Sequence, residues 1–221
     1  MARPITFARI AGLYAVTPDL ADTAKLVAKV SAAIEGGAAM VQYRNKSAGS
    51  ELRYNQALAL ARICAGRATF IVNDDAQLAL RVGADGVHVG EDDGAVPDAR
   101  VIVGPDCIVG VSCYNDLARA QELAAHGADY LAFGSFYPSS VKPQARRAEP
   151  ELLAHARQFA LPLVAIGGIT AANARVLVDA GANAVAVISD LFDHDDPAAI
   201  TRAATAIAAA FHSPRTMSGS P

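Results

Sequence analysis

The chain has 221 residues, 52% of them hydrophobic, and a formal net charge of −3 at pH 7. This length suits one well-filled domain, and the charge gives no overall basic field for nucleic acid or an anionic membrane. No apolar run approaches the roughly 20 residues of a transmembrane helix. The N-terminal stretch MARPITFARIAGLYAVT lacks an apolar core of signal-peptide length, so we expect a soluble, cytoplasmic protein.

Short apolar runs and segments with helical periodicity alternate along the chain. The apolar runs cover residues 13–17, 39–44, 69–73, 86–90, 107–112, 129–134, 161–168 and 184–189. The helical segments cover residues 23–35, 50–65, 76–82, 97–101, 116–126, 149–159, 171–179 and 197–211. The pattern therefore predicts eight strands, each followed by a helix or a helical turn.

The predicted strands are apolar throughout, which is typical of a parallel sheet covered by helices. Eight such units in 221 residues predict an α/β protein with a (β/α)8 TIM barrel. The alternative is a doubly wound open sheet, but such sheets usually have fewer strands, and no GxGxxG follows the first run. We expect one domain over residues 1–211 and a disordered tail at 212–221, where Ser, Pro and Gly are frequent.

A tripeptide G-A-D or G-A-N recurs at positions 83, 127 and 181, each time between a helical segment and a strand. Its glycine is expected to end the helix. The recurrence indicates a weak internal repeat of βα units.

Cysteine and histidine spacing predicts neither a disulfide framework nor a zinc site. The number of cysteines is odd, and no two of them have CxxC spacing; they are Cys64, Cys107 and Cys113. No HxxxH pair falls on a predicted helix. Cys64 and Cys107 lie in apolar patterns, so we interpret both as small buried hydrophobes.

In a barrel of this type the chemistry lies at the carboxyl ends of the strands. After the second strand, Gln42, Arg44 and Lys46 alternate along an extended segment and should project to one side. Two cations and an amide on one face suit a polyanionic ligand. The alternative is a solvated basic loop.

Acidic residues follow the third and fourth strands. Asp74 and Asp75 come first, and then a run of three acids at 91–93. Clustered carboxylates without Cys or His suit Mg²⁺, which also takes phosphate oxygens and water. The alternative is that Asp75 caps the next helix and that Asp92 and Asp93 stay in solvent.

A second anion site is predicted after the later strands. The sixth strand is followed by GSFYPSSVKP, which carries hydroxyls and Lys142, and the seventh by the glycines of AIGGIT. Glycines there, with backbone amides at the end of the eighth strand, form the usual phosphate cradle of this fold. The two sites together imply a metal-bound diphosphate and a monophosphate.

Taken together, these residues resemble the thiamine phosphate synthase (thiamine-phosphate pyrophosphorylase) family. The matching stretches are VQYRNK (41–46), FIVNDD and ALRVGADGVHVGEDD (within 70–93), GVS (110–112), ADYLAFGSFYPSSVK (128–142), AIGGIT (165–170) and GANAVAVIS (181–189). The resemblance implies a barrel that joins 4-amino-5-hydroxymethyl-2-methylpyrimidine diphosphate to a thiazole ethyl phosphate, or to its carboxylated form. The implied products are thiamine phosphate and diphosphate, with CO2 in addition from the carboxylated form, and the implied cofactor is Mg²⁺.

The resemblance also assigns residues. Those expected to bind the pyrimidine diphosphate are Gln42, Arg44, Lys46, Asn73, Ser112 and Lys142. Those expected to bind the thiazole phosphate are Ser139, Val141, Gly168, Ile188 and Ser189. The expected Mg²⁺ ligands are Asp74 and Asp93, and the expected catalytic residues are Arg44, Lys46, Ser112 and Lys142.

The chain departs from the family pattern at four positions. Glu91 replaces a glutamine and Asp92 a glutamate, so Asp92 competes with Asp93 for the role of second metal ligand. Ser139 keeps the hydroxyl of the first threonine of the pattern, whereas Val141 loses that of the second. We expect somewhat weaker phosphate binding and an intact site.

The expected reaction is a dissociative displacement of diphosphate that needs no protein nucleophile. The alternative functions account for these residues less well. A thiazole tautomerase on the same barrel would not need the diphosphate and metal residues, and a sugar-phosphate isomerase would leave one anion site unused. A non-catalytic sensor of thiamine phosphate would release no diphosphate. The expected partners are small-molecule substrates without nucleic acid or membrane, and the sequence allows a homo-oligomer without fixing its size.

Overall fold

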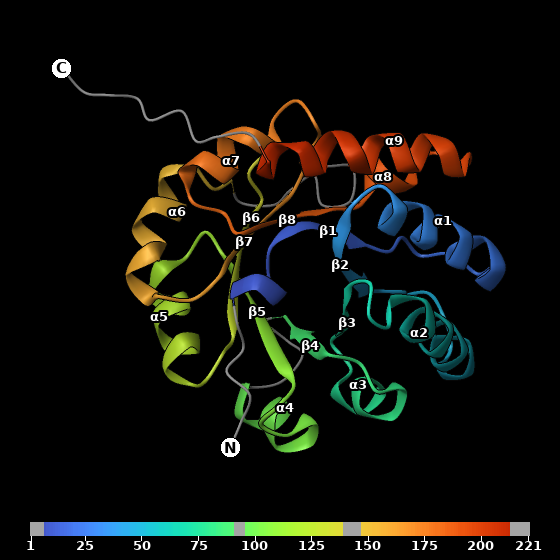
Figure 1. The fold of residues 1–221 in the computed structure, drawn as a ribbon. Coiled ribbons are helices and arrows are strands. Elements are labelled where there is room, and N and C mark those ends of the chain that lie inside the picture. Colours follow the sequence, from blue (N-terminus) through green and yellow to red (C-terminus); the bar gives the residue numbers. More distant parts are fainter. Residues whose placement is uncertain (1–6, 91–95, 139–146, 213–221) are drawn as a thin grey trace.

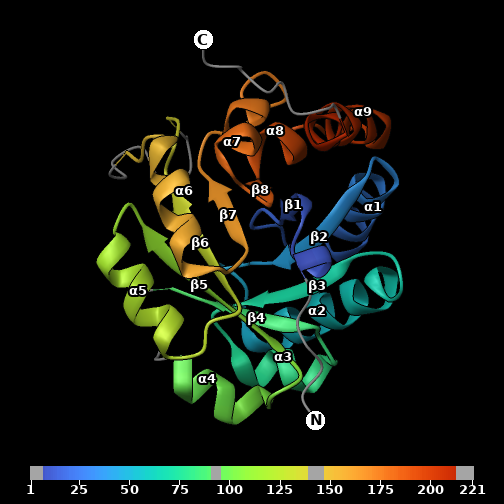
Figure 2. The ribbon, with the colours of Figure 1, turned by 60° about the vertical axis from the view of Figure 1, so that its left-hand side comes forward.

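Eight parallel strands form a closed ring at the centre of the molecule. The computed structural model describes residues 7–90, 96–138 and 147–212. Each strand hydrogen-bonds to its neighbours in chain order, and the first strand pairs with the last. Helices surround the ring (Figure 1, and Figure 2 from another side). The predicted barrel is confirmed, and the open-sheet alternative is wrong because β1 and β8 leave no free edge between them.

The predicted elements lie close to the observed ones. The strands are β1 (Gly12–Val16), β2 (Ala38–Tyr43), β3 (Thr69–Asn73), β4 (Gly86–Val89), β5 (Ile108–Tyr114), β6 (Tyr130–Gly134), β7 (Leu163–Ile166) and β8 (Ala184–Val187). The helices are α1 (Thr23–Glu35), α2 (Ser50–Cys64), α3 (Ala76–Val82), α4 (Val96–Val103), α5 (Leu117–Ala125), α6 (Glu151–Ala156), α7 (Ala174–Ala180), α8 (Ser189–Phe192) and α9 (Pro197–Ala208). Short 3-10 turns lie at η1 (Phe7–Arg9), η2 (Arg157–Phe159) and η3 (Ala209–Phe211).

Two differences from the predicted elements have local causes. Helix α7 begins at Ala174, later than predicted, because the Asn173 side chain accepts a hydrogen bond from the Thr170 amide (2.8 Å) and donates to the Gly168 carbonyl (3.0 Å). These two bonds hold residues 168–173 in a turn. Helix α8 was not predicted, because a single turn is too short to show helical periodicity.

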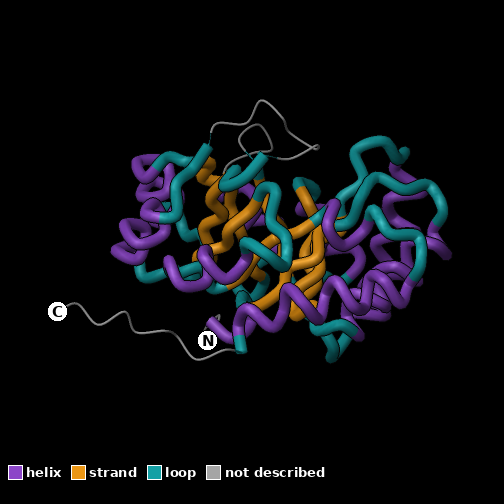
Figure 3. Tube along the Cα trace, turned by 90° about the horizontal axis from the view of Figure 1, so that it is seen from above, coloured by secondary structure: helices purple, strands orange, loops and turns teal. Residues whose placement is uncertain are grey.

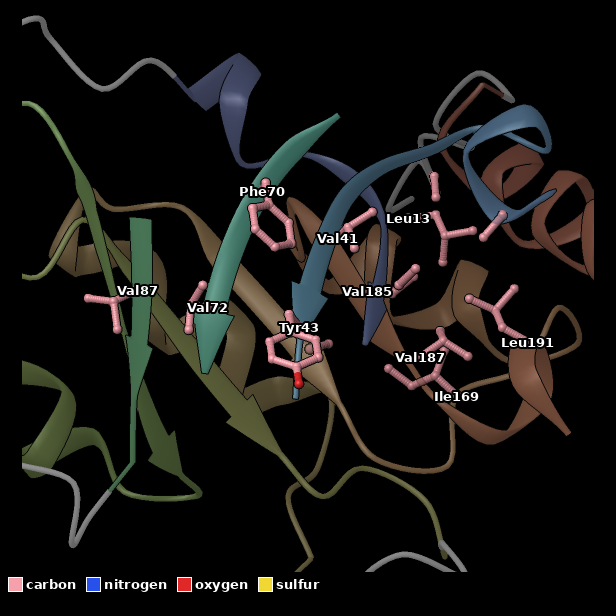
Figure 4. Packing of buried hydrophobic residues seen from close by; sticks show 14 of the residues in the cluster. Leu13, Val41, Tyr43, Phe70, Val72, Val87, Ile169, Val185, Val187 and Leu191 are labelled. Atoms are coloured by element: carbon pink, nitrogen blue, oxygen red, sulfur yellow. The ribbon is translucent and has the colours of Figure 1, made fainter. Parts of the chain in front are cut away.

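Both faces of the sheet are apolar, which explains the uninterrupted hydrophobic runs of the strands. One face packs against the helices through side chains such as Val41, Phe70 and Val87 (Figure 4). The other face fills the barrel, where Ile10, Met40 and other residues form a smaller cluster. The helices lie around the central strands when the molecule is seen from above (Figure 3).

One glycine makes room for the largest side chain inside the barrel. A Cβ atom on Gly110 would lie 1.9 Å from the ring of Tyr130, which is fully buried. No side chain fits at 110 unless Tyr130 moves. The glycine of the GVS stretch therefore has a packing role that fixes a buried aromatic ring below the carboxyl rim.

The G-A-D and G-A-N repeats have a common structural role at the amino ends of the strands. The carboxylates of Asp85 and Asp129 accept hydrogen bonds from the amides of Phe70 (2.8 Å) and Val109 (2.7 Å). Asn183 accepts in the same way from the Leu163 amide (2.9 Å). Each repeat thus provides a hydrogen-bond acceptor for a backbone amide at the start of the preceding strand, where no further strand residue is available to accept from it.

We predict that Asn183→Ala lowers the free energy of unfolding by about 1–3 kcal/mol, because the Leu163 amide would be left without its acceptor. Denaturant unfolding followed by circular dichroism measures this change. Gln121→Ala, an exposed substitution on α5, is the control and should change the stability little. Equal stabilities for the two variants would contradict this role of the repeat.

The cysteines pack in or against the core. Cys64 and Cys113 are buried, and burial raises the pKa of both thiols to about 12. Cys107, predicted to be buried, is only partly so, because it lies just before β5 at the end of the barrel.

None of the helices in the described part of the chain is long and apolar enough to cross a bilayer. Of the tail predicted to be disordered, all residues after His212 lie outside the described ranges.

Candidate active site

A pocket of about 1050 Å³ opens at the carboxyl ends of the strands, where the sequence predicted the chemistry. The predicted site residues that line it are Gln42, Arg44, Lys46, Asn73, Asp74, Ser112, Gly168, Ile188 and Ser189. The remaining predicted site residues, which fall outside the described ranges, are Asp93, Ser139, Val141 and Lys142. The described residues thus place the strand-two cations, one of the predicted metal ligands and the glycine turn around one cavity.

The two cations after β2 are held by carboxylates at the pocket wall. The Arg44 guanidinium lies 2.9 Å from the Asp19 carboxylate, and the Lys46 ammonium lies 3.4 Å from that of Asp74. The Thr17 hydroxyl bonds to the backbone of Arg44 in both directions, at 2.8 Å each. These contacts hold the segment after β2 in place, and Asp19 is a participant that the sequence reasoning missed.

Asp74 and Asp75 are neighbours with different roles. Asp74 has a φ of +64°, a left-handed conformation that is uncommon outside glycine, and its amide donates to the His88 carbonyl on β4 (2.8 Å). This turn directs the Asp74 side chain to the pocket. Asp75 caps α3 by accepting from the Leu78 amide (2.8 Å), which confirms the capping alternative for that acid.

Buried polar side chains form a hydrogen-bonded chain beneath the pocket. The Gln42 amide donates to the Tyr14 hydroxyl (2.9 Å), which lies 3.0 Å from the Tyr130 hydroxyl. His88 joins Tyr130 to Ser112, with Nδ1 2.8 Å from the Tyr130 hydroxyl and Nε2 2.9 Å from Ser112 Oγ. The chain crosses the barrel from β2 to β5 and fixes two predicted site residues, Gln42 and Ser112, at its ends.

The protonation of the two phenols bears on which groups donate and which accept along this hydrogen-bonded chain. Burial raises the pKa of Tyr14 and of Tyr130 above their ordinary values, so both phenols stay protonated. With Gln42 donating to Tyr14, each phenol can donate onward, and in the neutral tautomer with hydrogen on Nε2 His88 accepts from Tyr130 at Nδ1. In that tautomer His88 donates to Ser112 and cannot take its proton. Ser112 would then keep its own hydrogen for a group in the pocket, and His88 would not act as its base.

We predict that Tyr130→Phe lowers the free energy of unfolding by about 1–3 kcal/mol, because it removes the hydroxyl that lies within hydrogen-bonding distance of both His88 Nδ1 and the Tyr14 hydroxyl. It should also change the tautomer of His88, which nitrogen-15 NMR of the imidazole detects. Tyr54→Phe, a half-buried tyrosine on α2 outside the pocket, is the matched control. A spectrum that places the His88 hydrogen on Nδ1 in the wild-type protein would refute the direction assigned to the chain.

The glycines after β7 are required by packing as well as by backbone conformation. Gly167 and Gly168 have φ values of +103° and +62°. A Cβ atom on Gly167 would lie 2.0 Å from Ser135 Oγ, and one on Gly168 would lie 2.3 Å from the Pro138 carbonyl oxygen. The segment after β6 therefore lies directly against the glycine turn, so two parts of the predicted phosphate site support each other.

One carboxylate among the predicted metal ligands lies in the described part of the pocket wall. No group of three or more His, Cys, Asp or Glu side chains suited to a metal ion occurs within the described ranges. Asp74 contributes a carboxylate to the pocket beside Lys46, and a carboxylate without thiolate partners fits a hard cation such as Mg²⁺. The second predicted ligand, Asp93, lies outside the described ranges.

The fold and the pocket define a (β/α)8-barrel enzyme that combines paired cations and a carboxylate with a glycine turn at its carboxyl rim. The family model described as thiamine monophosphate synthase matches residues 13–191. The chain belongs to this family, and it is a transferase of thiamine biosynthesis that forms thiamine phosphate.

Individual relatives agree with the family model. A thiamine-phosphate synthase of Thiobacillus denitrificans is 56% identical over 84% of this chain and 89% of its own length. One of Methylobacillus flagellatus is 53% identical over 85% of this chain and 90% of its own length. The solved structure of a thiamine phosphate pyrophosphorylase from Pyrococcus furiosus superposes with a TM-score of 0.82, at 33% identity, over 94% of this chain and 98% of that chain.

Proposed function

We propose that the enzyme condenses 4-amino-5-hydroxymethyl-2-methylpyrimidine diphosphate with a thiazole ethyl phosphate, or with its carboxylated form, and releases diphosphate, together with CO2 when the carboxylated form is used. The observation that carries this proposal is the presence in one pocket of two walls with different groups suited to anions. The β2 and β3 wall has Arg44, Lys46 and Asp74, and the β7 and β8 wall has Gly168 and Ser189. A diphosphate suits the first wall and a monophosphate suits the second.

The residues at the first wall would bind the diphosphate and stabilise it as a leaving group. Asp74 and Asp93 would hold Mg²⁺, which when bound neutralises charge on the diphosphate. Arg44 and Lys46 would exchange their present carboxylate partners for diphosphate oxygens, and Lys142 would add a third cation. Gln42 and Asn73 would orient this substrate at the same wall.

The hydrogen-bonded chain would orient the pyrimidine. With His88 in the tautomer that carries hydrogen on Nε2, Ser112 would keep its own hydrogen for the ligand and would donate it to an acceptor nitrogen of the ring. Once diphosphate departs, the amino-pyrimidine can stabilise positive charge on the exocyclic carbon, and the thiazole nitrogen attacks that carbon. In this mechanism the protein positions the two rings and excludes water, and no side chain forms a covalent intermediate.

The thiazole phosphate would lie at the second wall. Gly168, Ile188 and Ser189 would contact it there, and Ser139 and Val141 would complete the site from the segment after β6. A cytoplasmic location belongs to the same proposal, because doubly and multiply charged substrates do not cross a membrane unaided.

The first test is direct. The protein is incubated with the pyrimidine diphosphate, the thiazole phosphate and Mg²⁺, and thiamine phosphate and diphosphate are measured. We expect both products in equal amounts. A tautomerase would change the thiazole alone and a sensor would release no diphosphate, so either result from folded protein would defeat the proposal.

We predict that Asp74→Asn lowers kcat by about 100-fold or more and removes most of the response to Mg²⁺, because the metal would lose a charged ligand. Asparagine tolerates the left-handed backbone at 74, so the turn should persist. Activity is measured over a Mg²⁺ titration. Asp75→Asn is the matched control, since asparagine also caps helices, and it should keep nearly normal activity. Near-normal activity in Asp74→Asn would remove Asp74 from the metal site.

A further inference from the structure

A buried lysine outside the barrel holds the segment that follows β8. Lys29 lies on α1, and only 7% of its side chain is exposed. Its ammonium donates to the backbone carbonyls of Phe192 (2.7 Å) and His194, and lies 3.3 Å from the Asp195 carboxylate. A buried charge requires such partners, so the position of this segment and the position of Lys29 depend on each other.

The segment held by Lys29 begins at the pocket. The one-turn helix α8 is closed by bonds from the Phe192 amide to the Ile188 carbonyl (2.9 Å) and from the Asp193 amide to the Ser189 carbonyl (3.0 Å). Asp193 and His194, the next residues, also line the pocket. Leu191 anchors the apolar side of the turn in the core (Figure 4). The turn therefore joins the pocket wall to the carbonyls that Lys29 binds.

We propose that Lys29 is a positioning residue for the monophosphate half of the reaction. This inference rests on the proposed function, which places the thiazole phosphate at Gly168, Ile188 and Ser189. Lys29 touches neither substrate. It fixes the rotation of α8 through the Phe192 carbonyl, and α8 fixes the backbone of Ile188 and Ser189.

The physical reason is that α8 is too short to hold itself. A single helical turn is unstable in isolation, and its last carbonyls have no partner within the helix. The Lys29 ammonium donates hydrogen bonds to two carbonyls at this end. Its positive charge also interacts favourably with the negative end of the helix dipole. Without the charge, these carbonyls would turn toward water, and the backbone at Ile188 and Ser189 would lose its fixed orientation.

Lys29→Met tests this inference, because methionine fills much of the same space without the charge. Lys25→Met is the matched control, since Lys25 lies one turn earlier on α1 and pairs with the same Asp195 at 2.9 Å but is more exposed. We expect KM for the thiazole phosphate to rise about tenfold in Lys29→Met, with KM for the pyrimidine diphosphate nearly unchanged. Lys25→Met should change neither KM.

Two further measurements separate positioning from general stability. Hydrogen exchange of the amides at 188–193 should be faster in Lys29→Met and unchanged in Lys25→Met. A lower melting temperature in Lys29→Met, with both KM values and the exchange rates unchanged, would overturn the inference. So would an equal rise in both KM values.

The design also distinguishes this inference from the function on which it rests. If the wild-type enzyme forms no thiamine phosphate, the proposed function fails, and calorimetric binding of inorganic phosphate to wild type and to both lysine variants then decides the role of Lys29. Weaker binding in Lys29→Met alone supports it, and equal binding in all three proteins refutes it. Should Lys29→Met fail to fold, Lys29→Gln keeps an amide donor without the charge, and its KM for the thiazole phosphate should rise above the wild-type value by less than tenfold while its KM for the pyrimidine diphosphate stays nearly unchanged.

Discussion

The ladder between β1 and β8 is the constraint on which the rest of the structure depends. It closes the sheet, so every inward side chain lies in one shared interior. Along β2 the inward residues change from Met40 near the amino end to Gln42 near the carboxyl end, and along β5 they change from Ile108 to Ser112. An open sheet would place these residues along a face. Closure instead brings them to the floor of one pocket.

Closure of the barrel also lowers the free-energy cost of burying the chain of polar side chains, because it provides them with hydrogen-bond partners. Hydroxyl, imidazole and amide groups inside a barrel would be costly without partners. From Gln42 to Ser112 each group has a neighbour at hydrogen-bonding distance, because strands on different sides of the ring aim their side chains at the centre. The floor of the pocket is therefore rigid and selective in hydrogen bonding, while the charged groups at the rim, such as Lys46, stay more exposed.

The sequence predicted the framework well because the framework depends on local signals. Apolar runs, helical periodicity and the recurrent glycines were enough to place the strands and most helices. The pocket residues after β2, β3, β5, β7 and β8 followed from strand order and from the family resemblance. For α8 and the Asn173 turn, the sequence carried no periodic signal.

Residues whose role depends on distant partners were missed. Tyr14 and Tyr130 look like ordinary core aromatics in sequence, and their hydroxyls meet only after the barrel closes across 116 positions. His88 had a usable signal, since it is the polar residue in the inward position of GVHVG. Asp19 and Lys29 had none, because Asp19 pairs with a residue two elements later and Lys29 with carbonyls near the end of the chain.

The left-handed backbone at Asp74 affects which substitutions position 74 can accept. Glycine would relieve that conformation, and asparagine would suit it at least as well as aspartate does. Selection for stability alone would thus move position 74 toward residues that cannot carry a negative charge. Because the turn itself suits glycine better than an acid, a search for more stable variants of this protein should hold position 74 fixed and look elsewhere.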